Sequence, residues 1–290
     1  EDPDEPKDPE TPHFIPAYSQ KVKASKEFQT FQFDHSFVLN SLKSSMEGYV
    51  FHNQPLDTDD LLEQTVKLFN SCKTSLELFD MLHNMRAYDD STYAHSLNVA
   101  LICRRIGKWL KVDAATLDTL TLCGLLHDIG KLKIPDEILN KPDKYTDEEF
   151  DLVKRHTKFG YELLKTLNID PHIKKAALLH HERCDGSGYP LKATQKDLDD
   201  FSMVVAIADV YDAMTAARSY RAPLCPFQVI ERFEQEGLQK YKPKFILTFL
   251  QHIASTYQNN RVLLSNGQSA NIVMLNQQHL ARPVSYTHLT

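Results

Sequence analysis

Histidine and aspartate residues gather in the middle of this 290-residue sequence, beside apolar segments of helical periodicity. Five histidines and two aspartates fall within 115 residues: His95, His127, Asp128, His156, His180, His181 and Asp209. A single histidine on an apolar helix is usually a hydrogen-bonded core residue. Seven such side chains buried separately would each need a partner, whereas one shared metal site would satisfy them together. The sequence therefore predicts a metal centre.

The mixture of imidazole and carboxylate ligands indicates which metal and which chemistry. These ligands suit iron, manganese, cobalt, nickel or zinc better than magnesium or calcium. Seven ligands are too many for one tetrahedral ion, and one aspartate can bridge two ions through its two oxygens. Two ions about 3.5–4 Å apart, with a hydroxide between them, are a common device for in-line attack on phosphorus. We therefore expect hydrolysis of a phosphoester.

The segments that carry these residues are predicted to be helices. Ser91 can cap a helix over residues 91–111, and Asp113 can cap a second helix that ends near His127. Thr146 and Glu149 form a capping-box pattern for a helix that continues to residue 167. Further helix starts are Asp170-Pro171, which opens a short helix ending at residues 180–181, Asp200, which precedes a helix to residue 216, Pro226 and Pro243.

Only two short segments have the character of strands. Residues 261–264 and 272–275 flank a turn signal at residues 265–267 and predict one small hairpin. The fold class is therefore mainly α, a helical bundle with an N-terminal helical region and a short C-terminal β-hairpin.

Composition excludes several classes of protein. Apolar residues make up 42% and charged residues 25%, as in a globular chain, and the formal charge of −6 comes mostly from residues 1–12. The nearly neutral remainder argues against a nucleic-acid-binding protein. No apolar run approaches the roughly 18 residues of a membrane span. Five scattered cysteines without CxxC spacing favour a reducing, cytoplasmic location over a disulfide framework or a zinc ribbon.

Two blocks of sequence resemble a known family. Residues 127–131 read HDIGK and residues 180–190 read HHERCDGSGYP, and this combination closely resembles the HD-GYP domain. The resemblance continues through ADVYDAMT at residues 208–215 and RSYR at residues 218–221, and it covers about residues 85–256. It implies an all-helical HD-domain fold with two or three metal ions. It also implies a bacterial phosphodiesterase of cyclic di-GMP.

The resemblance assigns roles to the metal-site residues. It implies six metal ligands: His127, Asp128, His156, His180, His181 and Asp209. Asp128 would bridge the ions, and His95 would be an additional ligand of the second or third ion. Some members of the family have a carboxylate four residues before the first histidine that helps to hold a third ion. Here that residue is Ser91. We therefore expect two transition-metal ions, iron or manganese before zinc, cobalt or nickel.

Other residues are assigned to catalysis and substrate binding. Lys131, with Asp128, is the predicted catalytic pair, because Lys131 follows His127 by one helical turn and could stabilise charge on a phosphate. Matching basic residues in the family bind substrate phosphate, which assigns that role to Arg218 and Arg221. Tyr189 and Gly188 of the glycine-containing loop are further candidates for contact with substrate.

The predicted organisation divides the chain into five parts. These are an acidic, proline-rich linker (1–16), an N-terminal helical region (17–84), the HD-GYP catalytic domain (85–258), a C-terminal β extension (259–283) and an artefactual tail (284–290). The chain starts without Met, so we interpret it as a fragment of a longer protein.

The predicted function is the hydrolysis of cyclic di-GMP to pGpG, with GMP left open as the end product, by a hydroxide that bridges two metals. Two alternatives stay open. One is an HD hydrolase of another nucleotide, and the other is a non-catalytic cyclic di-GMP receptor or interaction module. A diguanylate-cyclase or upstream sensor domain is the expected protein partner, and a homodimer is compatible with the sequence. No nucleic-acid partner and no membrane segment are expected.

Overall fold

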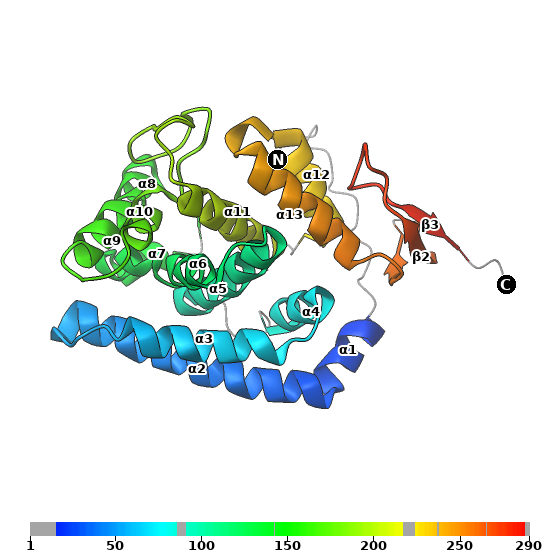
Figure 1. The fold of residues 1–290 in the computed structure, drawn as a ribbon, viewed down its shortest axis with the longest axis horizontal. Coiled ribbons are helices and arrows are strands. Elements are labelled where there is room, and N and C mark those ends of the chain that lie inside the picture. The colour runs from blue at the N-terminus through cyan, green and yellow to red at the C-terminus, as the bar shows by residue number, and fades with distance from the viewer. Residues whose placement is uncertain are drawn as a thin grey trace.

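The computed structural model describes residues 16–85, 91–141, 143–216, 224–236, 238–264 and 266–287. It is mainly helical, as the sequence predicts (Figure 1). The helices in order are α1 (Pro16–Ala24), α2 (Lys26–His52), α3 (Thr58–Ser71), α4 (Ser75–Met85), α5 (Thr92–Trp109), α6 (Ala114–Leu126), the 3-10 helix η1 (Ile129–Lys133), α7 (Asp136–Leu139), α8 (Asp147–Lys154), α9 (His156–Leu164), α10 (Pro171–Leu179), α11 (Asp200–Thr215), α12 (Pro226–Glu236), the 3-10 helix η2 (Leu238–Lys240) and α13 (Pro243–Thr256).

Side-chain caps fix where the central helices begin. Ser91 accepts a hydrogen bond from the backbone N–H of Ala94 and caps α5, and Asp113 does the same for α6. Thr146 and Glu149 make both hydrogen bonds of a capping box at α8. These three predicted starts are confirmed. At α11 the cap is Asp199, and Asp200 is the first helical residue.

The predicted helix over residues 146–167 is wrong in one respect, because the structure divides it into two helices. Helix α8 ends at Lys154, and α9 begins at His156. Arg155 is at once the C-cap of α8 and the N-cap of α9. The capping box could not signal this break, because it reports only where a helix begins. The break matters for function, since it puts His156 at the start of α9.

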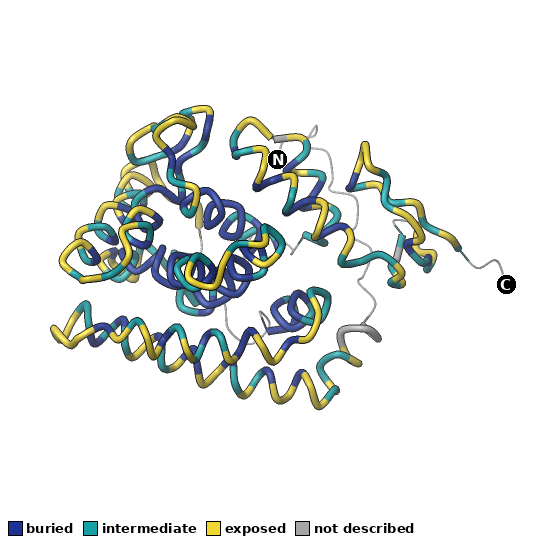
Figure 2. Tube along the Cα trace, in the orientation of Figure 1, coloured by how far each residue is buried: buried dark blue, intermediate teal, exposed yellow. Residues whose placement is uncertain are grey.

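The core lies around α5, α6 and α11, which are the most deeply buried helices (Figure 2). Helix α5 packs on α6 and α11, and α10 packs on α6, α9 and α11. Helices α2 and α3 run along one side of this bundle, and α12 and α13 lie on the opposite side (Figure 1). Buried side chains of α2, such as Phe28 and Met46, belong to the same hydrophobic cluster as those of α5 and α11. The N-terminal helical region therefore packs on the bundle that carries the predicted site.

Gly130 allows η1 to approach α9 closely. A Cβ at this position would lie 1.9 Å from the carbonyl oxygen of His156 and 2.4 Å from the backbone nitrogen of Gly160. Only a residue without a side chain fits there. The glycine of the HDIGK segment therefore brings the residues after α6 against the start of α9.

The strands form an antiparallel sheet in the order β1 (Arg261–Leu263), β2 (Ser269–Met274) and β3 (Val284–Tyr286). The predicted hairpin is present, but β3 was not predicted and lies in the segment interpreted as an artefactual tail. Val284 and Tyr286 suit an edge strand. The segment before β3 is tied to α12, because Glu234 accepts a hydrogen bond from the backbone N–H of Leu280 at 3.0 Å. Such long-range contacts are invisible in local sequence patterns.

Among the described residues, no helix has both the length and the apolar character needed to cross a membrane.

Candidate metal centre

The predicted ligands lie at the ends and on the inner faces of packed helices. His127 is the C-cap of α6, and Asp128 follows it. His156 is the first residue of α9, and His180 is the C-cap of α10 with His181 next to it. His95 projects from the first turn of α5, and Asp209 from the middle of α11. Each pair of ligands that adjoin in sequence is therefore held by a helix end packed in the core.

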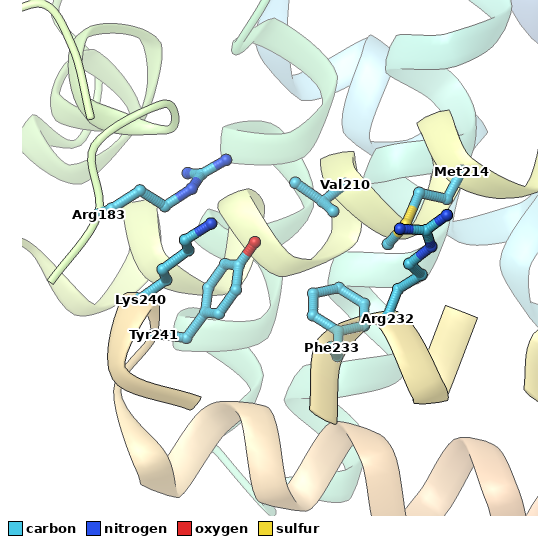
Figure 3. A pocket seen from close by; sticks show the side chains of 7 residues that line it. All are labelled: Arg183, Val210, Met214, Arg232, Phe233, Lys240 and Tyr241. Atoms are coloured by element: carbon cyan, nitrogen blue, oxygen red, sulfur yellow. The ribbon is translucent and has the colours of Figure 1, made fainter. Parts of the chain in front are cut away.

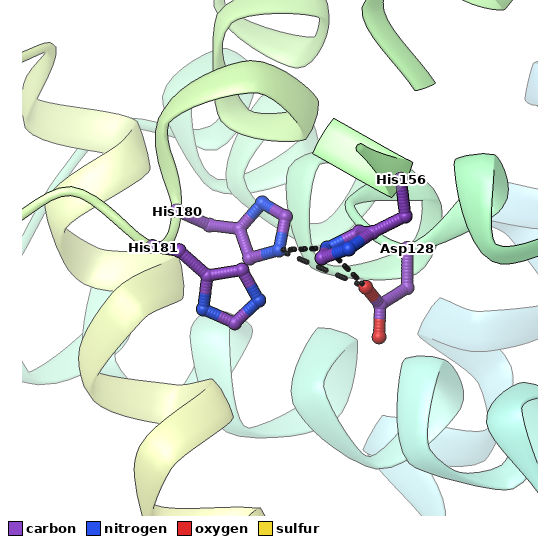
Figure 4. A group of neighbouring side chains, drawn as sticks. All are labelled: Asp128, His156, His180 and His181. Atoms are coloured by element: carbon purple, nitrogen blue, oxygen red, sulfur yellow. Dashed lines mark hydrogen bonds and ion pairs between the residues drawn. The ribbon is translucent and has the colours of Figure 1, made fainter. Parts of the chain in front are cut away.

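These side chains form two groups that share one carboxylate. Ligand atoms of Asp128, His156, His180 and His181 lie within 4.8 Å of one another (Figure 4). Ligand atoms of His95, His127 and Asp128 likewise lie within 4.8 Å of one another. Asp128 thus stands where a carboxylate that bridges two ions would have to stand. Six of the seven predicted ligands fall in these groups.

Three of the histidines are fixed in the same tautomer. The Nδ1–H of His127, His156 and His180 donates to a backbone carbonyl one turn earlier, at Gly124 (2.7 Å), Val153 (2.7 Å) and Ala176 (2.9 Å). A carbonyl can only accept, so Nδ1 carries the proton and Nε2 presents a lone pair. All three side chains are buried, with 0–1% exposure.

The lone pairs face one another and lack donors. The Nε2 atoms of His156 and His180 are 3.2 Å apart, and each lies near Oδ1 of Asp128, at 3.3 and 3.7 Å. The His127 Nε2 and Asp128 Oδ1 atoms are buried without a hydrogen-bond partner. Buried acceptors that converge on one another repel unless a cation or a proton lies between them. The donor set fits a divalent metal ion.

The pKa shifts of His156, His180 and Asp128 favour the protonation states that ligate metals. Burial lowers the pKa of His156 to about 3 and lowers the pKa of His180, so both imidazoles are neutral at neutral pH. Burial alone would raise the pKa of Asp128, but Lys131 and His127 outweigh it and hold the pKa well below its usual range. Neutral imidazoles around an ionised carboxylate are the forms that bind metal.

His95 connects the shared carboxylate to α11. Its Nε2 lies 3.1 Å from Oδ1 of Asp209, and Oδ2 of Asp209 lies 3.7 Å from Nδ1 of His181. The other nitrogen of His95, Nδ1, lies 2.8 Å from Oδ2 of Asp212. Burial lowers the pKa of His95, but Asp209 and Asp212 outweigh it and raise the pKa to about 9. Asp209 therefore lies between the two histidines that are closest to α11.

Asp212 is a member of the site to which the sequence reasoning gave no role. It is 2% exposed and lies one turn after Asp209 on α11. A carboxylate on the outer nitrogen of a metal-binding histidine fixes the tautomer and orientation of the ring. Its signal in the sequence was the three-residue spacing from Asp209, which places both carboxylates on one helix face.

Lys131 is close to the centre, but not on the helix of His127. Helix α6 ends at Leu126, and Lys131 lies on η1, with its backbone N–H bonded to the carbonyl of Asp128. The expected position one α-helical turn beyond His127 is therefore wrong. The change in helix type directs Lys131 back to Asp128, where Nζ donates to Oδ2 at 2.5 Å. The lysine side chain remains 23% exposed.

The loop after His181 is held by a buried carboxylate. Glu182 is 0% exposed and accepts hydrogen bonds from the backbone N–H groups of Leu191 (2.5 Å) and Ala193 (3.0 Å). The Tyr189 ring stacks on the His181 ring, with centroids 4.7 Å apart and an interplanar angle of 29°. The loop therefore covers the outer side of the candidate centre with an aromatic ring.

Gly188 has a packing role in this loop. A Cβ there would lie 2.4 Å from Cα of Glu182 and 2.5 Å from the carbonyl oxygen of His181. Contact of Gly188 or Tyr189 with a substrate stays a prediction. Arg218 and Arg221, the other predicted substrate-binding residues, lie outside the described residues.

Comparisons with known proteins show which family the chain resembles. The family model described as "HD domain" matches residues 60–245. A cyclic di-GMP phosphodiesterase of Thermotoga maritima is 35% identical, over 60% of this chain and 48% of its own length. The 3'3'-cGAMP-specific phosphodiesterase 2 of Vibrio cholerae is 34% identical, over 62% of this chain and 35% of its own length. The chain thus spans about half or less of the length of these relatives.

Among solved structures, the fold resembles that of Bd1817, a HDG"Y"P protein from Bdellovibrio bacteriovorus. The TM-score is 0.62, and the match covers 80% of this chain and 78% of that one. The sequence identity is 18%, so the likeness concerns the fold alone.

Proposed function

This chain belongs to the HD domain family, and we propose that it is a metal-dependent phosphodiesterase that hydrolyses cyclic di-GMP to pGpG, and pGpG onward to GMP. The observation that carries the proposal is the convergence of buried, donor-less ligand atoms on Asp128. The sequence motifs support the assignment to cyclic dinucleotides, since residues 180–190 carry the full GYP block.

We propose that the seven predicted residues hold two ions. Asp128 would serve both, with His156, His180 and His181 on one side and His95 and His127 on the other. Asp209 lies within reach of the second group through its 3.1 Å approach to His95. Bound divalent ions would polarise the phosphodiester and lower the pKa of the attacking water. Iron or manganese suits this ligand set, with zinc, cobalt or nickel as alternatives.

The protein's own side chains would bind the substrate and stabilise developing charge. Lys131 is partly exposed and already lies beside Asp128, so its ammonium could reach a phosphate oxygen held at the centre. We propose the same phosphate for the guanidinium groups of Arg218 and Arg221. Tyr189 would limit access of water and position the nucleotide from the outer side of His181.

Two alternative functions can be distinguished from hydrolysis of cyclic di-GMP. A relative named as specific for 3'3'-cGAMP makes that dinucleotide the second candidate substrate. A receptor without turnover would need no intact ligand set, and the convergent ligand atoms disfavour it.

The test is incubation of anaerobically purified protein with cyclic di-GMP or 3'3'-cGAMP, each with Fe(II) or Mn(II), followed by chromatography of the products. We expect pGpG and GMP from cyclic di-GMP, and none from an Asp128→Asn variant. Hydrolysis of 3'3'-cGAMP alone would move the assignment to that substrate. Binding of cyclic di-GMP by the metal-loaded protein without any product would establish a receptor instead.

Protein partners and location remain predictions. A diguanylate-cyclase domain, an upstream sensor domain and a second copy of the chain are the partners that the sequence suggests. We propose a cytoplasmic location, which the scattered cysteines favour.

A further inference from the structure

A polar cavity lies beside α11, and none of the candidate metal ligands lines it. It has a volume of about 140 Å³ and lies between α11, α12, η2 and the turn after His181. Its lining residues are Arg183, Val210, Met214, Arg232, Phe233, Lys240 and Tyr241 (Figure 3). Three of the seven are cations and none is acidic, in a chain whose formal net charge is −6.

Two of these cations, Arg183 and Lys240, converge in the cavity. In Figure 3 the guanidinium of Arg183, the ammonium of Lys240 and the hydroxyl of Tyr241 point into the same space. Within the described part of the chain, no carboxylate forms an ion pair with Arg183 or Lys240. Asp185 is an acidic neighbour of Lys240. Hydrogen bonds from Ser187, one of them at 2.6 Å, and the charge of Lys240 lower the pKa of its carboxyl group. Two like charges held together in this way favour an anion between them.

Two backbone carbonyls and the Tyr241 ring hold Arg183 in place. Its Nη1 donates to the carbonyls of His180 (3.2 Å) and Glu182 (2.8 Å), and its guanidinium lies 5.4 Å from the centroid of the Tyr241 ring. These contacts use one terminal nitrogen. Nε and Nη2 make no hydrogen bond to any other described residue. Nε and Nη2 form the edge of the guanidinium that can donate to two oxygens of one anion.

The aromatic residues that line the cavity are tightly packed. Tyr241 and Phe233 are 6% and 3% exposed and pack edge to face, with centroids 5.5 Å apart. Phe233 also packs edge to face on Phe249 of α13, at 6.0 Å. A preformed site loses little entropy on binding. The cavity is smaller than the roughly 300–1,000 Å³ that encloses a drug-sized ligand, so it suits one small anionic group.

We propose that this cavity, defined by Arg183, Arg232, Lys240 and Tyr241, binds a phosphate group at a site separate from the metal centre. The proposal does not rest on the proposed hydrolysis. A guanidinium fork, an ammonium and a phenol hydroxyl match the several oxygens of a phosphate better than the two of a carboxylate. The phosphate could be inorganic, or it could be the 5'-phosphate of a nucleotide whose remainder lies outside the cavity.

The site also contacts the metal centre through the backbone. The carbonyl that accepts from Arg183 belongs to His180, and Val210 in the lining follows Asp209 on α11.

The test is calorimetric titration of the full chain with inorganic phosphate, in chelator to remove binding at the metal centre. We expect saturable binding by the wild-type chain. Lys240→Gln and Arg183→Gln should each weaken binding by about tenfold or more, as expected for a lost charged hydrogen bond. Lys244→Gln is the matched control, because Lys244 is an exposed lysine four residues further along that does not line the cavity. Circular dichroism and thermal melts establish that each variant is folded.

Absence of saturable binding in the wild-type chain would overturn the proposal. An equal loss of phosphate affinity in Lys244→Gln would also overturn the proposal, because it would indicate only a general effect of surface charge. A parallel titration with GMP and with guanosine distinguishes the sources. Equal affinity for GMP and phosphate points to the free anion, and tighter binding of GMP with none of guanosine points to a nucleotide phosphate. None of these outcomes depends on whether the chain hydrolyses cyclic di-GMP.

Discussion

At the residue scale, the buried carboxylate of Asp128 pairs with the ammonium of Lys131. The Lys131 ammonium lies 2.5 Å from Oδ2 and stabilises the ionised form. Two divalent ions on the same carboxylate would supply that positive charge themselves and repel the ammonium. Lys131, which is 23% exposed, would then be free to turn to a substrate phosphate. We therefore expect the same side chain to pair with Asp128 and to reach a substrate phosphate.

Lys131→Ala should leave the metal content unchanged and lower kcat on the order of 10²–10³-fold, the cost of removing one preorganised charge donor. The matched control is Lys133→Ala, because Lys133 lies on the same 3-10 helix but points to the backbone carbonyl of Val50 on α2. Elemental analysis and steady-state kinetics with cyclic di-GMP measure the two effects. Nearly full turnover in Lys131→Ala would contradict the role of this lysine on the phosphate.

Asp212→Asn should weaken metal binding by about 10–100-fold, as is typical when the partner of a ligating histidine is lost. The amide keeps the size of the side chain but removes the charge that orients His95 through Nδ1. Metal affinity is measured by competition with a chromophoric chelator. The control is Asp118→Asn, which removes a partly exposed carboxylate paired with Arg104 away from the centre. Equal affinity in wild type and Asp212→Asn would mean that packing alone holds His95.

At the scale of elements, most of the candidate ligands lie at helix ends and few lie on helix faces. His127, His156 and His180 lie at helix termini, where a turn of backbone carbonyls is available to accept from Nδ1. The last turns of α6, α8 and α10 therefore fix the tautomers of His127, His156 and His180. The loop that follows α10 uses a different device, because it is tied by the buried Glu182 carboxylate.

Glu182→Gln should loosen this loop. One of the two backbone N–H groups would then face the amide NH2, which cannot accept, and the lost charged hydrogen bond costs about 1.5–3 kcal/mol. We expect a lower melting temperature and a higher KM, because the Tyr189 ring is no longer held on His181. Asp185→Asn, in the same loop but exposed, is the control. An unchanged melting temperature in Glu182→Gln would show that the loop does not depend on this carboxylate.

The sequence predicted elements well where the signal was local. Ser91, Asp113 and Thr146 were identified as helix caps because a cap is a contact within three residues, and the structure has all three. The break before His156 and the 3-10 geometry at Lys131 were missed, because both depend on how η1 packs on α9 through Gly130. That these histidines and aspartates come together could be predicted from their types and spacing, whereas the contact of Asp212 with His95 required the position of His95 in space.

At the scale of the molecule, the candidate centre depends on packing between segments far apart in the sequence. Helices α5, α6, α9, α10 and α11 each supply or adjoin a ligand, and they meet only in the folded chain. An unfolded chain cannot present the same constellation to a metal. Metal binding is therefore coupled to the stability of the whole fold.

We predict about two metal ions per chain, and a melting temperature that rises with metal loading. The ligands form two groups, and Ser91, at the position of a third-ion carboxylate in some relatives, instead uses its hydroxyl to cap α5. Metal at a hundredfold above its Kd stabilises a fold by about 2.7 kcal/mol, which corresponds to roughly 5 °C or more for a chain of this size. Elemental analysis of reconstituted protein and calorimetric melts with and without chelator measure both quantities.

Asp128→Asn tests whether the two groups form one centre. Because both groups contain Asp128, the variant should lose both ions and also the rise in melting temperature on metal loading. A control with Asp118→Asn should behave as wild type in both measurements. Loss of one ion with retention of the other would mean that Asp128 serves a single metal. A reproducible stoichiometry of three in the wild type would mean that a residue other than Ser91 completes a third site.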